Sequence, residues 1–462
     1  MDVEKVLRFA DELVLAKTGK HLDNLQQAIL VASWQGKRYS HIAKEFYCTE
    51  RHIANVASKL WQLLSKKIDE NVTKSNFRPA MERYYNCKVS NFNDVVNFGN
   101  INNFCTETSQ PSESSQKSPS TQNSSRDDNQ QELQFDLKNA PEIRAFYGRE
   151  TELATLQNQL LKQRCRIITL LGFRGIGKTT LALQLVEQVK SQFDYLIYRS
   201  LYFAPTPETT ILNLLQIFSP TEIPLDITTQ LSQLFDYLRK YRCLIILDDV
   251  QMLFAKEQLA GHYQNGLENY QRLFTLAAEV NHNSCLVLNS SEKLREIVNL
   301  EKDNQYCFSL VLESLDNAAT EILRKQNLVD ESSWLNLIQI YQGNPLWLKF
   351  ATNLIQELCG GSVARFLQFE MPIISESLQE LLDDSFNRLT NQEKLILQHI
   401  ADRAEPVGLE QIIGNFELSA TEIFKIIYSL RNRFWIKAID HRTITFSMTG
   451  SVVRQYIKMV GK

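Results

Sequence analysis

Residues 166–180 read RIITLLGFRGIGKTT and decide the fold of the main part of this chain. The first six residues are an apolar run typical of a buried strand, and TTLALQLVEQV from residue 179 predicts an amphipathic helix. Between them, residues 172–179 satisfy the pattern G-x-x-x-x-G-K-[ST] in full. A strand, a glycine-rich turn and a helix in this order predict a phosphate-binding loop, and a chance glycine-rich turn explains them poorly.

The residue types of this loop fit a nucleotide bound with Mg²⁺. Glycines let successive backbone N–H groups turn inward around phosphates, and the following helix N-terminus adds partial positive charge. We expect Lys178 to reach the β- and γ-phosphates and the Thr179 hydroxyl to ligate Mg²⁺. The expected phosphate-contacting residues are Gly172, Gly175, Ile176, Gly177, Lys178, Thr179 and Thr180. The sequence therefore predicts an ATP or ADP site.

A second acidic motif follows in residues 243–249, CLIILDD. An apolar run before two aspartates has the form of a Walker B strand, although alone it also fits a strand that ends in a turn. A carboxylate at the end of a buried strand can hold Mg²⁺ through water, which is the role expected of Asp248. Asp249 is the candidate to orient or deprotonate an attacking water, so Asp249 and Lys178 are the expected catalytic residues.

Strand and helix patterns alternate through the middle of the chain, which indicates a parallel sheet covered on both faces. The expected strands are 166–171, 195–200, 243–247, 284–288 and 306–312, and the expected helices are 152–161, 178–189, 208–217 and 229–239. Helical patterns dominate after about residue 316. The predicted fold class is therefore an α/β P-loop NTPase followed by helical parts.

Composition places this body in a multidomain protein. Hydrophobic content of 44% with 22% charged residues is ordinary for a soluble globular chain, and the net charge of −3 gives no overall attraction to nucleic acid or anionic membrane. No stretch is long and apolar enough to span a membrane. The N-terminus lacks the pattern of a signal peptide, so we expect a cytoplasmic protein without membrane partners. The eight cysteines form no metal-ligand spacing, which predicts buried thiols and no zinc site.

Residues 106–132 are almost devoid of apolar side chains and cannot offset the entropy of ordering. They predict a disordered linker, with bounds 105–139, between an N-terminal domain of residues 1–104 and the body. In the N-terminal domain, residues 22–34, 39–46 and 49–64 have helical periodicity, and the last of these begins at a capping threonine.

The body resembles an NB-ARC ATPase of the STAND class, of the type found in cyanobacterial signalling proteins, over residues 140–456. FYGRE at 146–150, CLIILDDV at 243–250 and Gly343-Asn344-Pro345-Leu346 are similar to three family motifs. The resemblance implies that Tyr147 and Arg149 lie over the adenine and that Pro345 touches the base from a helical subdomain. It also implies a nucleotide domain at 140–315, a four-helix subdomain at 316–375 and a winged-helix subdomain at 376–462.

Two positions depart from the family pattern. The sensor arginine that contacts the γ-phosphate corresponds to Ser291, and Lys293 could replace it only if the loop shifts. Loss of such a charge-assisted hydrogen bond costs about 1.5–3 kcal/mol of ATP-specific binding. The Met-His-Asp motif that senses ADP in plant relatives corresponds to Met448-Thr449-Gly450. We therefore expect weak or absent hydrolysis with retained ADP binding.

The N-terminal helices resemble a helix-turn-helix, like the one at the N-terminus of proteins associated with MoxR and von Willebrand A modules. Arg51, His52, Asn55 and Lys59 would face a DNA groove. Residues 1–67 contain 11 Lys and Arg against 7 Asp and Glu, a net charge of +4 that is too small to decide between partners. DNA binding, protein docking and a plain packed domain all remain compatible, and the resemblance favours docking of a protein partner.

The expected function is a signalling switch in which exchange of ADP for ATP opens the NB-ARC module and changes partner binding by the N-terminal domain. The alternatives are a nucleotide-responsive, DNA-binding transcription regulator and a slow ATPase proper. Proteins of this class usually carry a repeat sensor after the winged helix, and the sequence ends at Lys462 without one. We expect that sensor to be lost or replaced by a separate partner, and nucleotide-dependent self-association is compatible with the class.

Overall fold

The computed structural model describes the chain over residues 10, 22, 24–34, 49–68, 72–74, 76–77, 134–219, 224, 226–369, 372–440 and 444–461. The chain divides into two compact units, residues 1–121 and 122–462, and each is described by itself. The expected helix at 39–46 lies outside the described residues.

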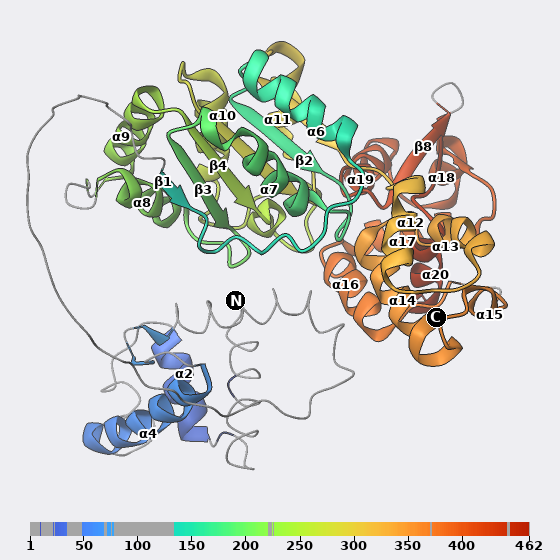
Figure 1. Ribbon diagram of the computed structural model, residues 1–462, viewed down its shortest axis with the longest axis horizontal. Coiled ribbons are helices and arrows are strands. Elements are labelled where there is room, and N and C mark those ends of the chain that lie inside the picture. The colour runs from blue at the N-terminus through green and yellow to red at the C-terminus, as the bar shows by residue number, and fades with distance from the viewer. Residues whose placement is uncertain are drawn as a thin grey trace, which may run out of the picture. The chain divides into compact units, whose positions relative to one another are not determined.

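The described part of the first unit contains two helices, α2 (Asn24–Trp34) and α4 (Glu50–Ile68) (Figure 1). Their apolar faces form one small core that includes Ile29, Leu30, Ile53 and Leu60. The ring of Phe77 completes this core, 5.0 Å from the Trp61 ring. The predicted inner face of the second helix is thus confirmed, because the spacing of three and four residues places these side chains on one side.

The second unit begins with a six-stranded sheet in which every neighbouring pair is parallel, in the order β1-β3-β4-β5-β2-β6. Its strands are β1 (Gln134–Asp136), β2 (Ile167–Leu171), β3 (Tyr195–Ser200), β4 (Cys243–Asp248), β5 (Cys285–Ser290) and β6 (Cys307–Val311). The predicted parallel sheet is confirmed. Because all strands run the same way, the residues that follow β2, β4 and β5 meet at one edge.

Alternate residues of these strands enter two separate cores on the two faces of the sheet, as a period of two requires. Ile167 and Ile245 pack with one set of helices, whereas Ile168 and Ile246 pack with the other. The helices around the sheet are α6 (Glu150–Gln157, extended by a wider turn to residue 162), α7 (Lys178–Val189), α8 (Pro207–Phe218), α9 (Ile227–Lys240), α10 (Asn269–Glu279) and α11 (Arg295–Asp303). The sheet is therefore covered on both sides (Figure 1).

Strand β1 differs from the sequence prediction, which placed residues 134–136 in the linker. Phe135 lies opposite Leu196, and β1 adds to the sheet as an edge strand beside β3. A strand of three residues is too short to show periodicity, and its partner supplies the pairing. Helices α10 and α11 were also unassigned from the sequence.

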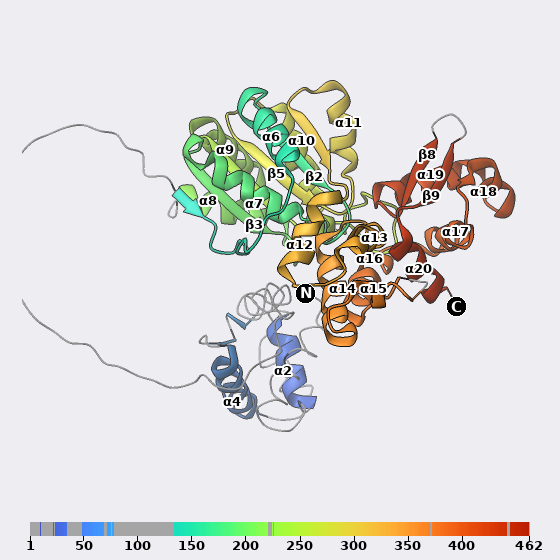
Figure 2. The ribbon, with the colours of Figure 1, turned by 45° about the vertical axis from the view of Figure 1, so that its right-hand side comes forward.

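Residues 316–461 form the rest of the second unit and lie to one side of the six-stranded sheet in both views (Figures 1 and 2). The first group of helices is α12 (Thr320–Lys325), α13 (Trp334–Ile340), α14 (Pro345–Cys359) and α15 (Val363–Phe366). The second group is α16 (Glu376–Phe386), α17 (Asn391–Asp402), β7 (Val407–Gly408), α18 (Leu409–Asn415), α19 (Ala420–Asn432), β8 (Ile436–Asp440), β9 (Thr445–Met448) and α20 (Ser451–Val460). The order from α17 to β9, with the three-stranded sheet β7-β9-β8, is that of a winged helix.

One hydrophobic core runs through both groups and includes Trp347, Leu382, Trp435 and Tyr456. Four cysteines of the second unit, Cys165, Cys243, Cys285 and Cys307, are free and buried. Within the described residues, no helix is both long enough and apolar enough to cross a bilayer.

Candidate functional site

The glycine-rich loop of residues 172–177 joins β2 to α7 at the carboxyl edge of the sheet. Gly172, Gly175 and Gly177 have φ values of 142°, 85° and 101°, a region that L side chains rarely adopt. Gly177 is the residue before the first helical turn of α7, and a Cβ atom there would meet nothing within 4 Å. The loop therefore turns as the motif requires and leaves open space at the N-terminus of α7.

The Lys178 side chain folds back over the loop. Its ammonium donates hydrogen bonds to the carbonyl oxygens of Gly172 at 2.9 Å and Phe173 at 3.2 Å. Burial lowers the pKa of Lys178 to about 8, although the nearby carboxylates of Asp248 and Asp249 favour the charged form. The predicted phosphate-binding lysine thus lies beside both predicted acidic residues.

Asp248 and Asp249 follow β4 at the same edge of the sheet. Asp248 is 4% exposed, and its carboxylate accepts hydrogen bonds from the Tyr198 hydroxyl and the Asp249 backbone N–H, both at 2.9 Å. Asp249 has a φ of 60° and accepts hydrogen bonds from Gln251 and Ser200. Burial and the charge of Asp248 raise the pKa of Asp249 to about 6.

The carboxylate of Asp248 is the kind of donor that Mg²⁺ prefers. Each Asp248 oxygen accepts one described hydrogen bond, which leaves further acceptor capacity on a carboxylate. Where side chains are described, no three His, Cys, Asp or Glu residues group as a metal site. Mg²⁺ is commonly held by one or two carboxylates together with water and substrate phosphates, so Asp248 and Thr179 are a suitable protein contribution.

The FYGRE segment lies against the far end of the loop. The Arg149 guanidinium donates hydrogen bonds to the backbone oxygens of Ile176 and Glu313 and pairs with Glu152 at 2.6 Å. The ammonium of Lys325 lies 4.8 Å from the centre of the Tyr147 ring. Arg149 therefore joins α6, the loop and the segment after β6, and Tyr147 contacts α12.

The Gly343–Leu346 segment packs directly on the loop. The Asn344 side-chain amide donates to the Arg174 carbonyl oxygen at 3.0 Å, and the Leu346 N–H donates to the Gly175 oxygen at 3.4 Å. Pro345 is the first residue of α14, where its missing N–H costs nothing. The structure thus brings the residues on both sides of Pro345 to the loop, from which they are about 170 residues distant in the chain.

Gly175 lies at the closest approach of α14 to the loop, so replacing it with alanine should separate the two. A Cβ atom there would be 2.7 Å from the Leu346 Cβ and 2.9 Å from the Asn344 Oδ1, and its φ of 85° adds backbone strain. We expect Gly175→Ala to lower the thermal midpoint and to speed the release of bound nucleotide. Gly266→Ala is the matched control, because Gly266 has a φ of 84° and open space around it. Equal effects of the two variants would contradict the role of the close contact.

Phe173 carries an aromatic contact from the loop to both other parts of the unit. Its ring centre is 5.4 Å from that of Trp347 on α14 and 5.4 Å from that of Trp435 before β8, edge-on in each case. Phe386 and Tyr456 extend the group through Trp435. We call these five residues the aromatic cluster. Consequently, the glycine-rich loop is itself part of the interface between the sheet and the two helical groups.

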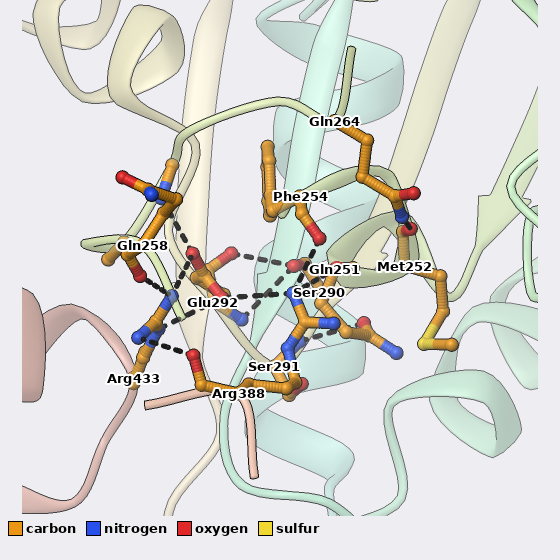
Figure 3. Close-up of polar contacts among 12 residues, drawn as sticks. Gln251, Met252, Phe254, Gln258, Gln264, Ser290, Ser291, Glu292, Arg388 and Arg433 are labelled. Atoms are coloured by element: carbon orange, nitrogen blue, oxygen red, sulfur yellow. Dashed lines mark hydrogen bonds and ion pairs between the residues drawn. The ribbon is translucent and has the colours of Figure 1, made fainter. Parts of the chain in front are cut away.

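The segment after β5 contains Ser291, which the sequence pattern matches to the family's sensor arginine. The Ser291 backbone N–H donates to the Gln251 side chain at 3.1 Å, and the next residue, Glu292, is 2% exposed. Glu292 accepts from the Gly261 N–H at 2.6 Å and pairs with Arg433 at 3.2 Å and Arg388 at 3.5 Å. Figure 3 shows both arginines pointing toward Glu292 from the winged-helix side. The segment after β5 therefore packs against the winged-helix part.

Arg388 and Arg433 make further bonds that fix this contact. Arg388 donates to the backbone oxygens of Gln251 and Phe254, and Arg433 donates to that of Gln258 (Figure 3). Arg433 also pairs with Glu393 at 3.0 Å. Glu393 is part of the capping box at the start of α17 as well. We call Glu292, Arg388, Glu393 and Arg433 the buried ion cluster; two positive and two negative charges balance within it.

The described contacts of Lys293 and of residues 448–450 are with residues outside the glycine-rich loop. Burial lowers the pKa of Lys293, and the charges that act on it are those of Arg431 and Glu301. Thr449 donates its hydroxyl to the Phe434 carbonyl oxygen. A Cβ atom on Gly450 would overlap the Gln342 side chain at 2.0 Å, so that side chain occupies the space an aspartate would need.

Several residues of the site were not foreseen. Tyr198 and Ser200 come from β3, and Glu292, Arg388 and Arg433 come from three separate segments. An isolated tyrosine or arginine carries no local pattern, so no sequence signal identified them. The roles predicted for the loop residues, Asp248 and Asp249 stay predictions, although the structure gathers these residues at one edge.

The sheet order, the glycine-rich loop before α7 and the two aspartates after β4 define this unit as a P-loop NTPase. Residues 149–308 match the NB-ARC domain, and residues 1–84 match the vWA-MoxR associated protein N-terminal HTH domain. The chain thus carries an NB-ARC domain behind a helix-turn-helix domain, as the resemblance drawn from its motifs implied.

Two curated relatives and one solved structure illustrate the similarity. The uncharacterized WD repeat-containing protein alr2800 of Nostoc sp. is 33% identical over 65% of this chain and 25% of its own length. Disease resistance protein RRS1B of Arabidopsis thaliana is 28% identical over 55% of this chain and 18% of its own. The chain thus spans a quarter or less of these relatives. The Walker-type ATPase PABY2304 of Pyrococcus abyssi is 17% identical with a TM-score of 0.49, over 68% of this chain and 96% of that one.

Proposed function

We propose that this protein is a signalling switch that binds ADP or ATP with Mg²⁺ at the glycine-rich loop and changes its subdomain arrangement when the nucleotide is exchanged. One observation carries the proposal: residues 173–175 of the loop contact both α14 and the winged-helix part. A ligand that reshapes the loop must act on these contacts, so it has different affinities for closed and open arrangements. The proposed parts are residues 140–315, 316–375 and 376–462.

The side chains at the loop have distinct proposed roles. Lys178 moves from the loop carbonyl oxygens to the β- and γ-phosphates, and the N-terminus of α7 binds the phosphate oxygens. Asp248 and Thr179 hold Mg²⁺, which supplies positive charge beside the phosphates. Asp249 orients the attacking water. On the opposite side, Tyr147, Arg149 and Pro345 contact the base.

The segment that contains Ser291 and Glu292 is the reason we propose weak ATP hydrolysis and retained ADP binding. Ser291 offers no cation to the γ-phosphate, and the adjacent Glu292 is committed to two arginines of the winged helix. Without that cation, the transition-state charge is less well stabilised. The site is therefore suited to holding nucleotide for long periods, and any ATPase activity is slow.

The N-terminal domain is the proposed output of the switch, in the cytoplasm. Its match to the helix-turn-helix of vWA-MoxR associated proteins supports docking of a protein partner, with DNA contact through the same domain as the alternative. Lys59 on α4 is exposed, whereas the side chains of Arg51, His52 and Asn55 lie outside the described residues. Nucleotide exchange changes partner binding by this domain and allows self-association.

The tryptophans beside Phe173 provide a direct test. The chain has five tryptophans, and replacing Trp34, Trp61 and Trp334 with phenylalanine leaves Trp347 and Trp435 as reporters. We expect the purified protein to contain ADP. Exchange for a non-hydrolysable ATP analogue should then shift the tryptophan emission to longer wavelength and increase its quenching by acrylamide, because the aromatic cluster separates.

One control variant and two parallel measurements give this experiment a clear outcome. The Lys178→Ala variant of the reporter protein should show no nucleotide-dependent change. Partner capture and self-association are measured in parallel with ADP and with the ATP analogue. An empty site in the purified protein that also fails to bind added ADP, or identical emission in both nucleotide states, would contradict the proposed function.

A further inference from the structure

Arg174 is the third residue of the glycine-rich loop and has two attachments outside it. Its carbonyl oxygen accepts the hydrogen bond from Asn344. Its guanidinium pairs with Asp384 of α16 at 3.0 Å, and the two side chains are 33% and 51% exposed. Burial opposes the charge of Arg174, but the carboxylates of Asp384 and Asp249 outweigh it and raise its pKa. Arg174 is therefore a charged group that joins the loop to the winged-helix part.

The charge of Arg174 also reaches the place where a terminal phosphate would bind. The Lys178 ammonium bonds the carbonyl oxygens of Gly172 and Phe173, the two residues that directly precede Arg174. Arg174 is also among the charges that act on Asp249 and Lys178. Lys178 and Asp249 flank the γ-phosphate position of the proposed function. Arg174 is thus a second cation beside this position, and it comes from the loop itself.

The segment after β5, where the family pattern places the sensor arginine, supplies no such cation in its Ser291 and Glu292. Ser291 carries no charge, Glu292 belongs to the buried ion cluster, and the charges acting on Lys293 are Arg431 and Glu301. Ser291 and Glu292 therefore present no positive charge to the γ-phosphate. A cation from another element is needed for this role.

We propose that Arg174 is the residue that distinguishes ATP from ADP: it pairs with Asp384 when ADP is bound and turns to the γ-phosphate when ATP is bound. The inference rests on the proposed nucleotide switch. Half-exposed ion pairs contribute little, whereas a guanidinium bound to phosphate makes charge-assisted, often bidentate hydrogen bonds. The exchange of partners is accordingly favourable once the γ-phosphate is present.

Loss of the Arg174–Asp384 pair would affect other contacts of the winged-helix part, because Asp384 lies on α16. Asp383, the neighbour of Asp384, accepts a hydrogen bond from Tyr456 at 2.5 Å, and Phe386 belongs to the aromatic cluster. Arg388 follows two residues later and contributes to the buried ion cluster. Helix α16 and the turn after it therefore connect the loop with both the aromatic cluster and the buried ion cluster.

Two substitutions separate this role from a purely structural one. Dissociation constants of ADP and of a non-hydrolysable ATP analogue with Mg²⁺ are measured by calorimetry on the full chain after removal of bound nucleotide. Arg174→Gln should lower the affinity for the ATP analogue by about 10- to 100-fold while the affinity for ADP changes little. Asp384→Asn should act in the opposite direction and raise the affinity for the ATP analogue relative to that for ADP, because Arg174 no longer has its carboxylate partner.

A simple closing contact would give a different pattern. If the Arg174–Asp384 pair only holds α16, both variants should change the two affinities alike, and that result would overturn the proposal. Asp384→Asn keeps the test decisive even if Arg174→Gln fails to fold. Arg239→Gln, which removes an exposed pair with Asp236, is the control and should leave the selectivity unchanged. Wild-type protein that binds neither nucleotide would instead contradict the proposed function.

Discussion

Arg433→Met is expected to destabilise the second unit by about 3–5 kcal/mol, because it leaves two buried carboxylates with a single cation. Glu292 and Glu393 are 2% and 0% exposed, so water cannot replace the lost guanidinium. The hydrogen bond from Arg433 to the Gln258 carbonyl oxygen is lost as well. Calorimetric unfolding of the full chain should show a midpoint lowered by about 10 °C, together with faster release of bound nucleotide.

A second variant tests whether charge imbalance is the cause. Adding Glu292→Gln to Arg433→Met removes both members of the 3.2 Å Arg433–Glu292 pair and leaves one cation and one carboxylate in the cluster. The double variant should therefore be less destabilised than the two single effects added together. Arg239→Met is the matched control, since Arg239 and Asp236 are 49% and 69% exposed, and its effect should stay within about 1 kcal/mol. Strictly additive effects would argue against a coupled cluster.

Lys178→Ala is expected to weaken ADP and ATP binding by at least about 100-fold, because it removes the charge-assisted hydrogen bonds to the phosphates. Lys178 is partly exposed, and its hydrogen bonds to the carbonyl oxygens of Gly172 and Phe173 are only partly buried. Loss of these bonds should therefore have little effect on folding. The purified variant should contain no bound nucleotide, as measured by chromatography of the denatured protein, and calorimetry should detect no binding at micromolar concentrations.

The control for this variant is Lys190→Ala just after α7. Lys190 pairs with Glu187 at the surface, with side chains 49% and 54% exposed, and should keep its full nucleotide content. If Lys178→Ala retained ADP at the wild-type level, the glycine-rich loop would not be the binding site. Ordinary ATPase turnover in the wild type that is abolished by Lys178→Ala would contradict the prediction of weak hydrolysis.

The parts of the site that lie within one short segment were predictable. The strand, glycines and helix around Lys178 follow one another in the chain, so their periodicity and spacing identify the loop. Asp248 is likewise marked by the apolar run that precedes it. The sequence also identified Ser291 as a departure from the family pattern, since that comparison needs only a position.

Contacts between distant segments were not predictable. Glu292 and Arg433 stand 141 residues apart, and nothing in either segment specifies the other. Their pairing depends on how the winged helix packs on the segment after β5, which is a property of the folded unit. The replacement of aspartate by Gly450 was visible in the sequence, but its reason, the Gln342 side chain, comes from another subdomain.

The position of Glu292 has a consequence for synthesis of the chain on the ribosome. The strands of the six-stranded sheet are all made once Val311 has been added, and folding of the N-terminal parts begins first. At that stage Arg388 and Arg433 have not been made, so Glu292 lacks its ion-pair partners, and Phe173 likewise lacks Trp347 and Trp435. The last segments to emerge complete its interior, which makes the winged helix a late folding partner of the nucleotide domain.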